Sequence, residues 1–249
     1  MTWPRSLERI ADAFWWPTIN ISIWGLVTVY LQKQTGTTSA FFANIFLGGI
    51  MMWGVVSRSQ EEMGILFLQE AWDRNLLNMF ASPLTLTEFM IATIELATFK
   101  LMLTFLWMFA LSYFLFAFNI FSFGWVLLPY AIALMVSGWS LGLVINGLII
   151  RYGFRVQAFA WTLALLFQPF SGVYYPISAI PHWMQIVARL LPTSYIFEGM
   201  RSVMQTHRID ISGLAIAIGL NIIYLALGIW FFVRSYREAQ KTGMLMKFT

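Results

Sequence analysis

Residues 125–150 read WVLLPYAIALMVSGWSLGLVINGLII and contain no charged side chain. A helix needs about 20 consecutive apolar residues to cross the hydrocarbon core of a bilayer, so this stretch predicts a transmembrane helix. Further apolar runs occur at 16–31, at 41–57, from after Glu88 to about 118, at 156–175 and at 211–233. We therefore expect an all-α membrane protein with six transmembrane helices.

The composition agrees with a membrane protein. Of the 249 residues, 59% are hydrophobic and 10% are charged, whereas about 25% of the residues in a soluble domain are charged. These figures exclude a soluble enzyme, a disordered protein and an ordinary nucleic-acid-binding protein. The chain contains no cysteine, which excludes disulfides and thiolate metal sites. We expect one transmembrane domain over residues 1–249.

The first 15 residues have an amphipathic pattern. Trp3, Leu7, Ile10 and Phe14 recur at spacings of four, three and four, with charged residues between them. This spacing predicts a helix that lies in the membrane interface over residues 1–15. The segment lacks the basic start and apolar core of a signal peptide, so we expect none.

Lysine and arginine are unequally distributed between the two sets of loops. The set that includes both chain ends holds ten of them, and the other set holds Lys33, Arg189, Arg201 and Arg208. Cytoplasmic loops of membrane proteins carry the excess of these residues. We therefore expect both termini in the cytoplasm, with 234–249 as a cytoplasmic tail.

A long uncharged stretch precedes the last predicted span. No charge occurs between Arg155 and Arg189, and Pro169 and Gly172 interrupt the stretch. It is too long for one crossing and too short for two crossings with a loop. Non-helical backbone at membrane depth occurs only where it is buried in protein or lines a cavity. We expect the fifth span to run outward and residues 169–208 to form an outer re-entrant helical hairpin and loop.

The third predicted span is longer than a bilayer is thick. Residues 84–118 contain neither proline nor glycine, and as one helix they would extend roughly 50 Å. The start of this helix should therefore extend into the cytoplasmic interface. Lys100 could then reach the lipid headgroups with its long side chain.

The cytoplasmic segment 58–83 is the largest polar excursion of the chain. It nevertheless contains large apolar residues, among them Trp72, Leu76 and Phe80, which a simple connection does not need. This mixture predicts a short helix that either docks onto another protein or lies on lipid. The pattern alone leaves both interpretations open.

Two stretches resemble a known family. Residues 70–83 (EAWDRNLLNMFASP) resemble the cytoplasmic loop of permease subunits from type-2 ATP-binding-cassette (ABC) exporters. Residues 169–176 (PFSGVYYP), followed by PHW, LPTSY and EGMR up to residue 201, resemble the signature that precedes the last span in that family. The resemblance covers essentially the whole chain.

The resemblance implies a division of labour between subunits. Two copies of such a six-span subunit form the pathway as a dimer, and each rests on a separate ATP-binding subunit. By position, a coupling helix that contacts this ATPase falls on Glu70, Trp72, Asp73, Arg74, Leu76, Leu77 and Phe80. A second, smaller contact falls on Arg151 and Arg155. The chain contains no GxxxxGK[ST] motif, so ATP and magnesium are expected on the partner and no cofactor on this chain.

Several residues before the last span are candidates for the pathway or its outer gate. They are Gln168, Phe170, Tyr174, Tyr175, Trp183, Glu198 and Arg201. Gln168 precedes the helix break, and the aromatic rings could stack on sugar rings or lipid tails. The alternatives are an interfacial aromatic belt for the rings and a simple interfacial ion pair for Glu198 and Arg201. No motif predicts a metal site or a catalytic residue.

These observations predict a transport subunit rather than an enzyme. The resemblance implies ATP-driven export across a bacterial or archaeal plasma membrane. The scarcity of charge within the spans favours an amphiphilic or hydrophobic substrate, such as a lipid-linked glycan, a lipid or a drug. An ATP-independent secondary transporter or channel is the alternative, for which Glu95 is the acidic candidate. A membrane anchor without transport activity is a third possibility.

Overall fold

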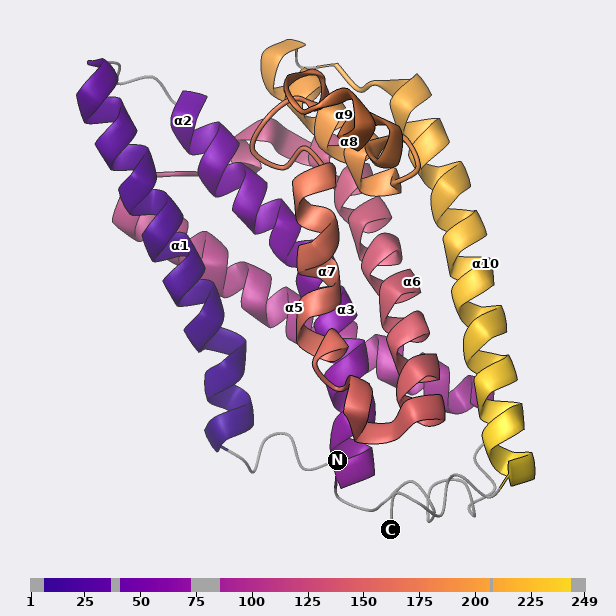
Figure 1. Cartoon of the computed structure of the whole chain (residues 1–249). Helices are drawn as coiled ribbons and strands as arrows, with labels where there is room; N and C mark the ends of the chain where they lie inside the picture. The colour runs from indigo at the N-terminus through magenta and orange to yellow at the C-terminus, as the bar shows by residue number, and fades with distance from the viewer. Residues whose placement is uncertain (1–6, 37–40, 73–85, 207, 243–249) are drawn as a thin grey trace.

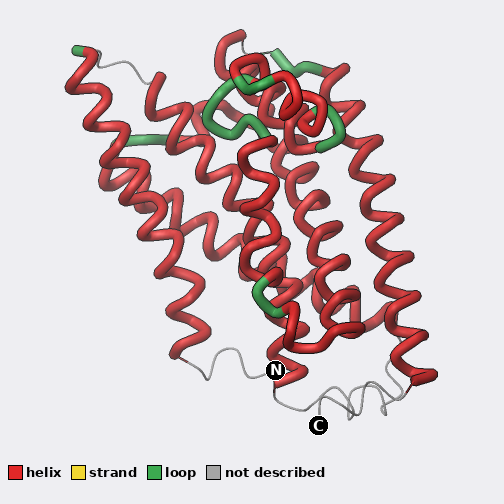
Figure 2. The backbone as a smooth tube through the Cα atoms, in the orientation of Figure 1, coloured by secondary structure: helices red, strands yellow, loops and turns green. Residues whose placement is uncertain are grey.

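A computed structural model describes residues 7–36, 41–72, 86–206 and 208–242 (Figure 1). Within these ranges every regular element is a helix, and no strand is present (Figure 2). The all-α fold expected from the apolar runs is therefore confirmed for the described part of the chain.

The long helices are α1 (Leu7–Thr35), α3 (Gly49–Trp72), α5 (Leu86–Phe116), α6 (Leu128–Tyr152) and α10 (Ile211–Thr242). The short α2 (Phe41–Ala43) and a π-helical turn, η2 (Asn44–Gly48), lead into α3. Short 3-10 segments are η3 (Ile120–Leu127), η4 (Gly153–Val156), η5 (Gln168–Phe170) and η6 (Ile177–Ala179). The remaining helices are α7 (Phe159–Phe167), α8 (His182–Ala188) and α9 (Pro192–Thr206).

Three helical stretches among the described residues are long and apolar enough to cross a membrane. They are Met90–Phe116, Gly124–Tyr152 and Ile211–Ala239. The other predicted spans fall in α1 and α3, which are long enough but more polar, and in α7, which is part of a shorter apolar stretch, Phe159–Phe170. The six-span arrangement therefore stays a prediction.

The centre of the bundle is a close crossing of α3 and α6, with α10 packed on the other side of α6 (Figure 1). Gly138 of α6 makes this crossing possible. A Cβ atom there would lie 2.6 Å from the Cβ of Ser59 and from the carbonyl oxygen of Val56, which is closer than atoms can approach. The absence of a side chain thus lets the two backbones touch.

The short helices α8 and α9 gather at one end of the bundle, where α9 packs against α6 and α10 (Figure 1). The chain then turns into α10 at Asp210, whose Oδ1 accepts hydrogen bonds from the Gly213 N–H (3.0 Å) and the Ser212 hydroxyl (2.7 Å). These are the bonds of a helix N-cap. They hold the pKa of the Asp210 carboxyl below its usual value.

Two predicted boundaries differ from the structure. Residues 7–15 do not form a separate interfacial helix, because α1 continues without a break from Leu7 to Thr35, with Pro17 inside it. The segment expected to leave the bundle at residue 58 instead remains helical up to Trp72. Arg58 and Glu62 are consequently buried within the bundle.

Lys100 also differs from its predicted position. Its Nζ lies 2.6 Å from Oε2 of Glu62, and both side chains are only 4% exposed. The lysine therefore pairs with a carboxylate on α3 instead of reaching the headgroups. The expectation of a single long helix around it is confirmed, since α5 runs unbroken from Leu86 to Phe116.

Candidate substrate groove and coupling elements

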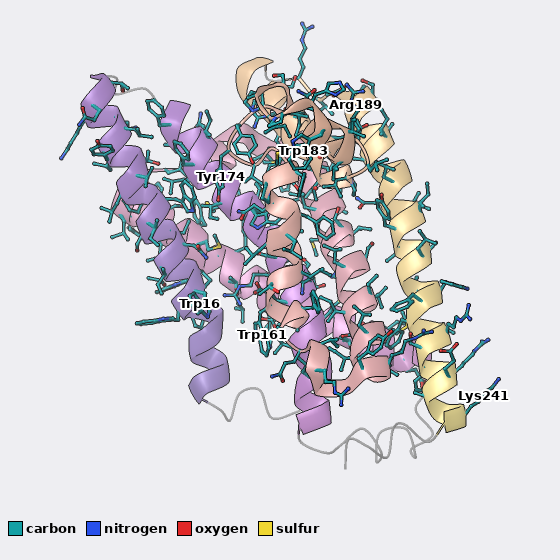
Figure 3. All side chains as sticks on the ribbon, in the orientation of Figure 1. Trp16, Trp161, Tyr174, Trp183, Arg189 and Lys241 are labelled. Atoms are coloured by element: carbon teal, nitrogen blue, oxygen red, sulfur yellow. The ribbon has the colours of Figure 1, made fainter. Side chains whose placement is uncertain are left out.

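A groove of about 570 Å³ lies between α1, α3 and α7, with one contact from α5. The residues of α1 and α5 that line it are Trp16, Pro17, Asn20, Trp24 and Met108. Those of α3 are Ile50, Trp53, Gly54, Ser57, Arg58 and Glu61. Those of α7 and the chain that follows it are Trp161, Thr162, Leu165, Gln168 and Tyr174. Figure 3 labels Trp16, Trp161 and Tyr174, which belong to three different parts of this lining.

One part of the groove carries charge. Arg58 and Glu61 are three residues apart on α3, and Nη1 of the arginine lies 3.5 Å from Oε2 of the glutamate. The side chains are 7% and 19% exposed, so both are largely removed from solvent. A charge pair in such surroundings interacts more strongly than one on an open surface. This part of the groove suits a polar or charged group.

Another part is aromatic. The Tyr174 ring stacks on Trp24 with 4.3 Å between centroids, and Phe46 stacks on the same tryptophan at 5.5 Å. Gln168 Nε2 donates a hydrogen bond to the Tyr174 hydroxyl at 3.2 Å. This cluster is beside Gly49, because a Cβ atom there would lie 3.5 Å from the Tyr174 ring.

The charged and the aromatic parts are well separated along α3. Gly49 and Glu61 are twelve residues apart in this helix, which corresponds to about 18 Å along its axis. The groove thus has a polar region and an aromatic region a substantial distance apart. Such a surface matches an amphiphilic molecule.

A set of polar contacts fastens the chain after α7 onto α9, and we refer to it as the polar clamp. Glu198 Oε1 accepts from the Ile177 N–H at 2.6 Å and lies 3.1 Å from Nη1 of Arg201. Nη2 of Arg201 donates to the Gly172 carbonyl at 2.7 Å. Gly172 has a φ of +65°, and a Cβ there would lie 2.7 Å from Ile177. The clamp holds the turn that carries Tyr174.

The structure divides the predicted pathway residues into groups. Gln168 and Tyr174 line the groove. Glu198 and Arg201 form the polar clamp rather than part of the lining. The remaining predicted aromatic residues contact neighbours within the same segment, residues 169–183. Phe170 meets Trp183 edge to face at 6.2 Å, and the Tyr175 hydroxyl donates to the Pro169 carbonyl at 2.7 Å.

Most of the predicted coupling helix cannot be compared with the structure. Asp73, Arg74, Leu76, Leu77 and Phe80 lie outside the described residues. Glu70 and Trp72 form the last turn of α3, and their side chains are likewise not described.

Of the two residues of the second predicted ATPase contact, Arg151 binds other residues of the same chain. Nε of Arg151 donates to the Ser235 hydroxyl at 2.7 Å, and Nη2 lies 2.8 Å from Glu238 Oε2. The guanidinium also lies 5.1 Å from the centre of the Phe231 ring. Arg151 therefore joins α6 to α10, while Arg155 is exposed on η4.

Sequence reasoning missed several groove residues. Trp16 fitted the start of the first predicted span at 16–31, and Arg58 and Glu61 fitted the cytoplasmic segment 58–83. The spacing of Arg58 and Glu61 was the available signal, because residues three apart share a helix face. Nothing in the sequence placed Trp24 of α1 against Tyr174, since that contact depends on how distant segments pack.

Comparison with known proteins decides the family. A sequence model of the family described as "ABC-2 type transporter" matches residues 5–205, which is most of the chain. The chain belongs to the ABC-2 type transporter family. No match was found among curated proteins.

Membership places the chain among transport subunits. ABC-2 membrane domains are transport subunits that are not themselves catalytic, and they normally pair with an ATP-binding subunit. This chain is accordingly a membrane-transport component with apolar helices. Among the described residues, no three His, Cys, Asp or Glu side chains are grouped so that they could hold a metal ion.

Proposed function

We propose that this ABC-2 chain is the transmembrane subunit of an ATP-driven exporter. In this proposal two copies form the pathway, two separate ATP-binding subunits supply the energy, and the groove binds an amphiphilic substrate before its release outward. The substrate classes that fit are a lipid-linked glycan, a lipid or a hydrophobic drug. The membrane is a bacterial or archaeal plasma membrane, with both termini in the cytoplasm.

The observation that carries the substrate class is the polarity of the groove. The Arg58–Glu61 pair offers charge for a head group, and the Trp24–Tyr174 cluster offers flat apolar surface for a tail or a sugar ring. A small inorganic ion would not need the aromatic region. A purely apolar molecule would displace water from the Arg58–Glu61 pair without offering it a new polar contact, which costs free energy.

Substitution of Trp161 tests whether the groove binds substrate. Trp161 lines it and is 38% exposed, so a ligand in the groove would contact this side chain. We expect Trp161→Ala to raise the half-maximal concentration of an amphiphile that stimulates ATP hydrolysis in the reconstituted complex. An aromatic contact contributes about 0.5–1.5 kcal/mol, which corresponds to a roughly 2- to 12-fold change.

Trp125 provides the matched control for this experiment. It is 87% exposed and is not part of the groove lining. Trp125→Ala should therefore leave the half-maximal concentration unchanged. Equal effects of the two substitutions would count against a substrate site in the groove.

A second experiment tests whether the segment at the end of α3 docks onto the ATP-binding subunit. Replacing Trp72 and Leu76 together with Asp should abolish co-purification of the chain with its P-loop ATPase, because the substitutions put charge on the apolar surface proposed to dock. Lys241→Asp, at the exposed end of α10 (Figure 3), is the control and should preserve the complex. A complex that survives the double substitution would contradict the docking proposal.

One observation favours the ATP-independent alternative. Glu62 is a buried carboxylate, and ion-coupled transporters place acidic residues inside the membrane. Its contact with Lys100 gives it a structural partner instead. Proteoliposomes that contain the chain alone separate the two functions, because sustained uphill transport on a proton or sodium gradient would establish the alternative.

A further inference from the structure

The side chain of Gln60 on α3 binds the backbone of α7 at two points. Its Nε2 donates a hydrogen bond to the Ala160 carbonyl at 2.8 Å. Its Oε1 accepts a hydrogen bond from the Ala164 N–H at 3.1 Å. The residue is 0% exposed, so water does not compete for these contacts.

The two backbone groups that Gln60 binds are the usual donor and acceptor of one α-helical hydrogen bond. In an α-helix the N–H of each residue bonds to the carbonyl four residues earlier, and Ala160 and Ala164 are four residues apart in α7. The Gln60 amide carries one acceptor and one donor on adjacent atoms. It therefore binds the two ends of a single link in the hydrogen-bond ladder of α7.

Side chains that insert into this ladder are one of the identifiable causes of helix bending. The amide supplies α7 with an alternative partner for both groups, so the turn between Ala160 and Ala164 can open without leaving either group unsatisfied. Gln60 thus both fastens α7 to α3 and offers α7 a place to bend.

The residues around the contact permit this approach. Ala160 and Ala164 are both fully buried and have only methyl side chains. Gly64, one turn after Gln60 on α3, lies so close that an added Cβ would be 3.3 Å from the Ala160 Cβ. Larger residues at these positions would hold the amide away from the α7 backbone.

The contact lies between two walls of the groove. Gln60 is adjacent in sequence to Glu61, which lines the groove from α3. Ala160 is adjacent to Trp161, which lines it from α7. Gln60 is also twelve residues before Trp72, where α3 ends and the proposed coupling segment begins. A displacement of that segment along α3 reaches this contact directly.

We propose that Gln60 is the positioning residue that makes α7 follow α3, through its two hydrogen bonds to the Ala160–Ala164 turn, when the coupling segment moves. This inference rests on the proposed function and adds the route by which ATP hydrolysis reaches the groove. Without the contact, α3 can move while α7 remains in place, and hydrolysis no longer changes the groove as a unit.

The first experiment measures transport per ATP hydrolysed in proteoliposomes that contain the chain and its ATPase. We expect Gln60→Leu to retain ATP hydrolysis but to lower transport per ATP by roughly 5- to 150-fold, the usual range of a coupling between two sites. The shorter Gln60→Asn, which reaches only one of the two backbone groups, should give a smaller loss. It carries the test if Gln60→Leu does not fold.

Asn221 of α10 is the matched control. It is an equally buried amide that joins two helices, because its Nδ2 donates to the Ala133 carbonyl of α6 at 2.8 Å and its Oδ1 accepts from Ser137 at 2.8 Å. Asn221→Leu should lower the melting temperature as Gln60→Leu does, yet leave transport per ATP unchanged. If it lowered that ratio equally, general destabilisation would explain the result and the proposal would be overturned.

A second experiment observes the helices directly. The chain has no cysteine, so Ser57→Cys on α3 and Leu166→Cys on α7 introduce the two thiols for spin labels. With labelled chains diluted among unlabelled ones, so that each complex holds one labelled copy, we expect one narrow distance distribution, unchanged between the nucleotide-free and the vanadate-trapped complex. Adding Gln60→Leu should broaden it and make it differ between the two states. A distribution that Gln60→Leu leaves unchanged would overturn the proposal.

The same labels separate a failure of the proposed export function from a failure of the proposed α3–α7 contact. If the wild-type complex shows no ATP-driven transport, the proposed function fails. The distance distribution of the purified subunit alone then still tests the fastening of α7 to α3, because broadening by Gln60→Leu supports it and an unchanged distribution refutes it.

Discussion

The buried Glu62–Lys100 pair leads to a quantitative prediction for Glu62→Gln. The two charged atoms are 2.6 Å apart and both side chains are 4% exposed. The substitution leaves the buried ammonium of Lys100 facing a neutral amide in place of a carboxylate. Removing one partner of a buried ion pair typically costs about 3–5 kcal/mol. For a chain of this size, about 2–4 °C of melting temperature corresponds to each kcal/mol.

We therefore expect Glu62→Gln to lower the melting temperature of the purified subunit in detergent by about 6–20 °C. Differential scanning fluorimetry of the intrinsic tryptophans can measure this change. Replacing both residues with apolar ones, as in Glu62→Leu with Lys100→Met, should recover most of the loss, because an apolar pair needs no charge compensation.

The Arg234–Glu238 pair provides the control. Its side chains are 58% and 47% exposed, and exposed pairs four residues apart on a helix contribute about 0.3–0.5 kcal/mol. Arg234→Gln should shift the melting temperature by no more than about 2 °C. If Glu62→Gln shifts it as little as Arg234→Gln, or the double apolar variant is no more stable than Glu62→Gln, our account of the buried pair is refuted.

Three further predictions concern the packing of α6, the N-cap of α10 and the polar clamp. Gly138→Ala should cost about 1–3 kcal/mol in thermal unfolding, because it overpacks the crossing of α3 and α6, whereas Gly219→Ala, with no atom within 4 Å of an added Cβ, should be neutral or slightly stabilising. Asp210→Ala should cost about 0.5–2 kcal/mol as a lost helix cap. Because the folded pKa of Asp210 is lowered, the carboxylate stabilises the fold above about pH 4, and this stabilisation is lost as the pH falls through the folded pKa. The free energy of unfolding of Asp210→Asn, measured against pH, should lack this loss. Arg201→Gln should accelerate proteolysis near Gly172, where the clamp holds the chain, and unchanged cleavage would contradict that role.

The sequence predicted the long apolar helices because their evidence is local. An uncharged run such as 125–150 must be buried or face lipid wherever it lies in the fold. The break after α7 was predictable for a similar reason, since Pro169 cannot continue a helix and Gly172 readily adopts the positive φ that the turn uses.

The positions of charged residues were harder to predict because they depend on distant partners. Arg58 and Glu62 looked like part of a solvated loop, yet Glu62 is buried against Lys100, 38 residues further along the chain. A buried charge is tolerated when it is paired, and a single sequence does not show which residue provides the pair.

The candidate site also combines residues that local sequence evidence predicts with residues whose position depends on distant partners. Gln168 was predicted as a pathway residue because it precedes a helix break. The structure places it in the lining of the groove, and its part in a pathway stays a prediction. The opposite wall comes from α1, whose approach to Tyr174 depends on the packing of Trp24 and Phe46. That wall could not be derived from the spacing of residues within any one segment.

The placement of α1 also has a mechanical consequence. This helix packs against α5 on one flank and presents Trp16, Asn20 and Trp24 to the groove on the other. The tight crossing at Gly138 lies elsewhere, between α3 and α6. A tilt of α1 would therefore change the width of the groove without disturbing the crossing of α3 and α6. In the proposed exporter, such a tilt would let the groove admit substrates of different bulk once the Trp24–Tyr174 stack separates.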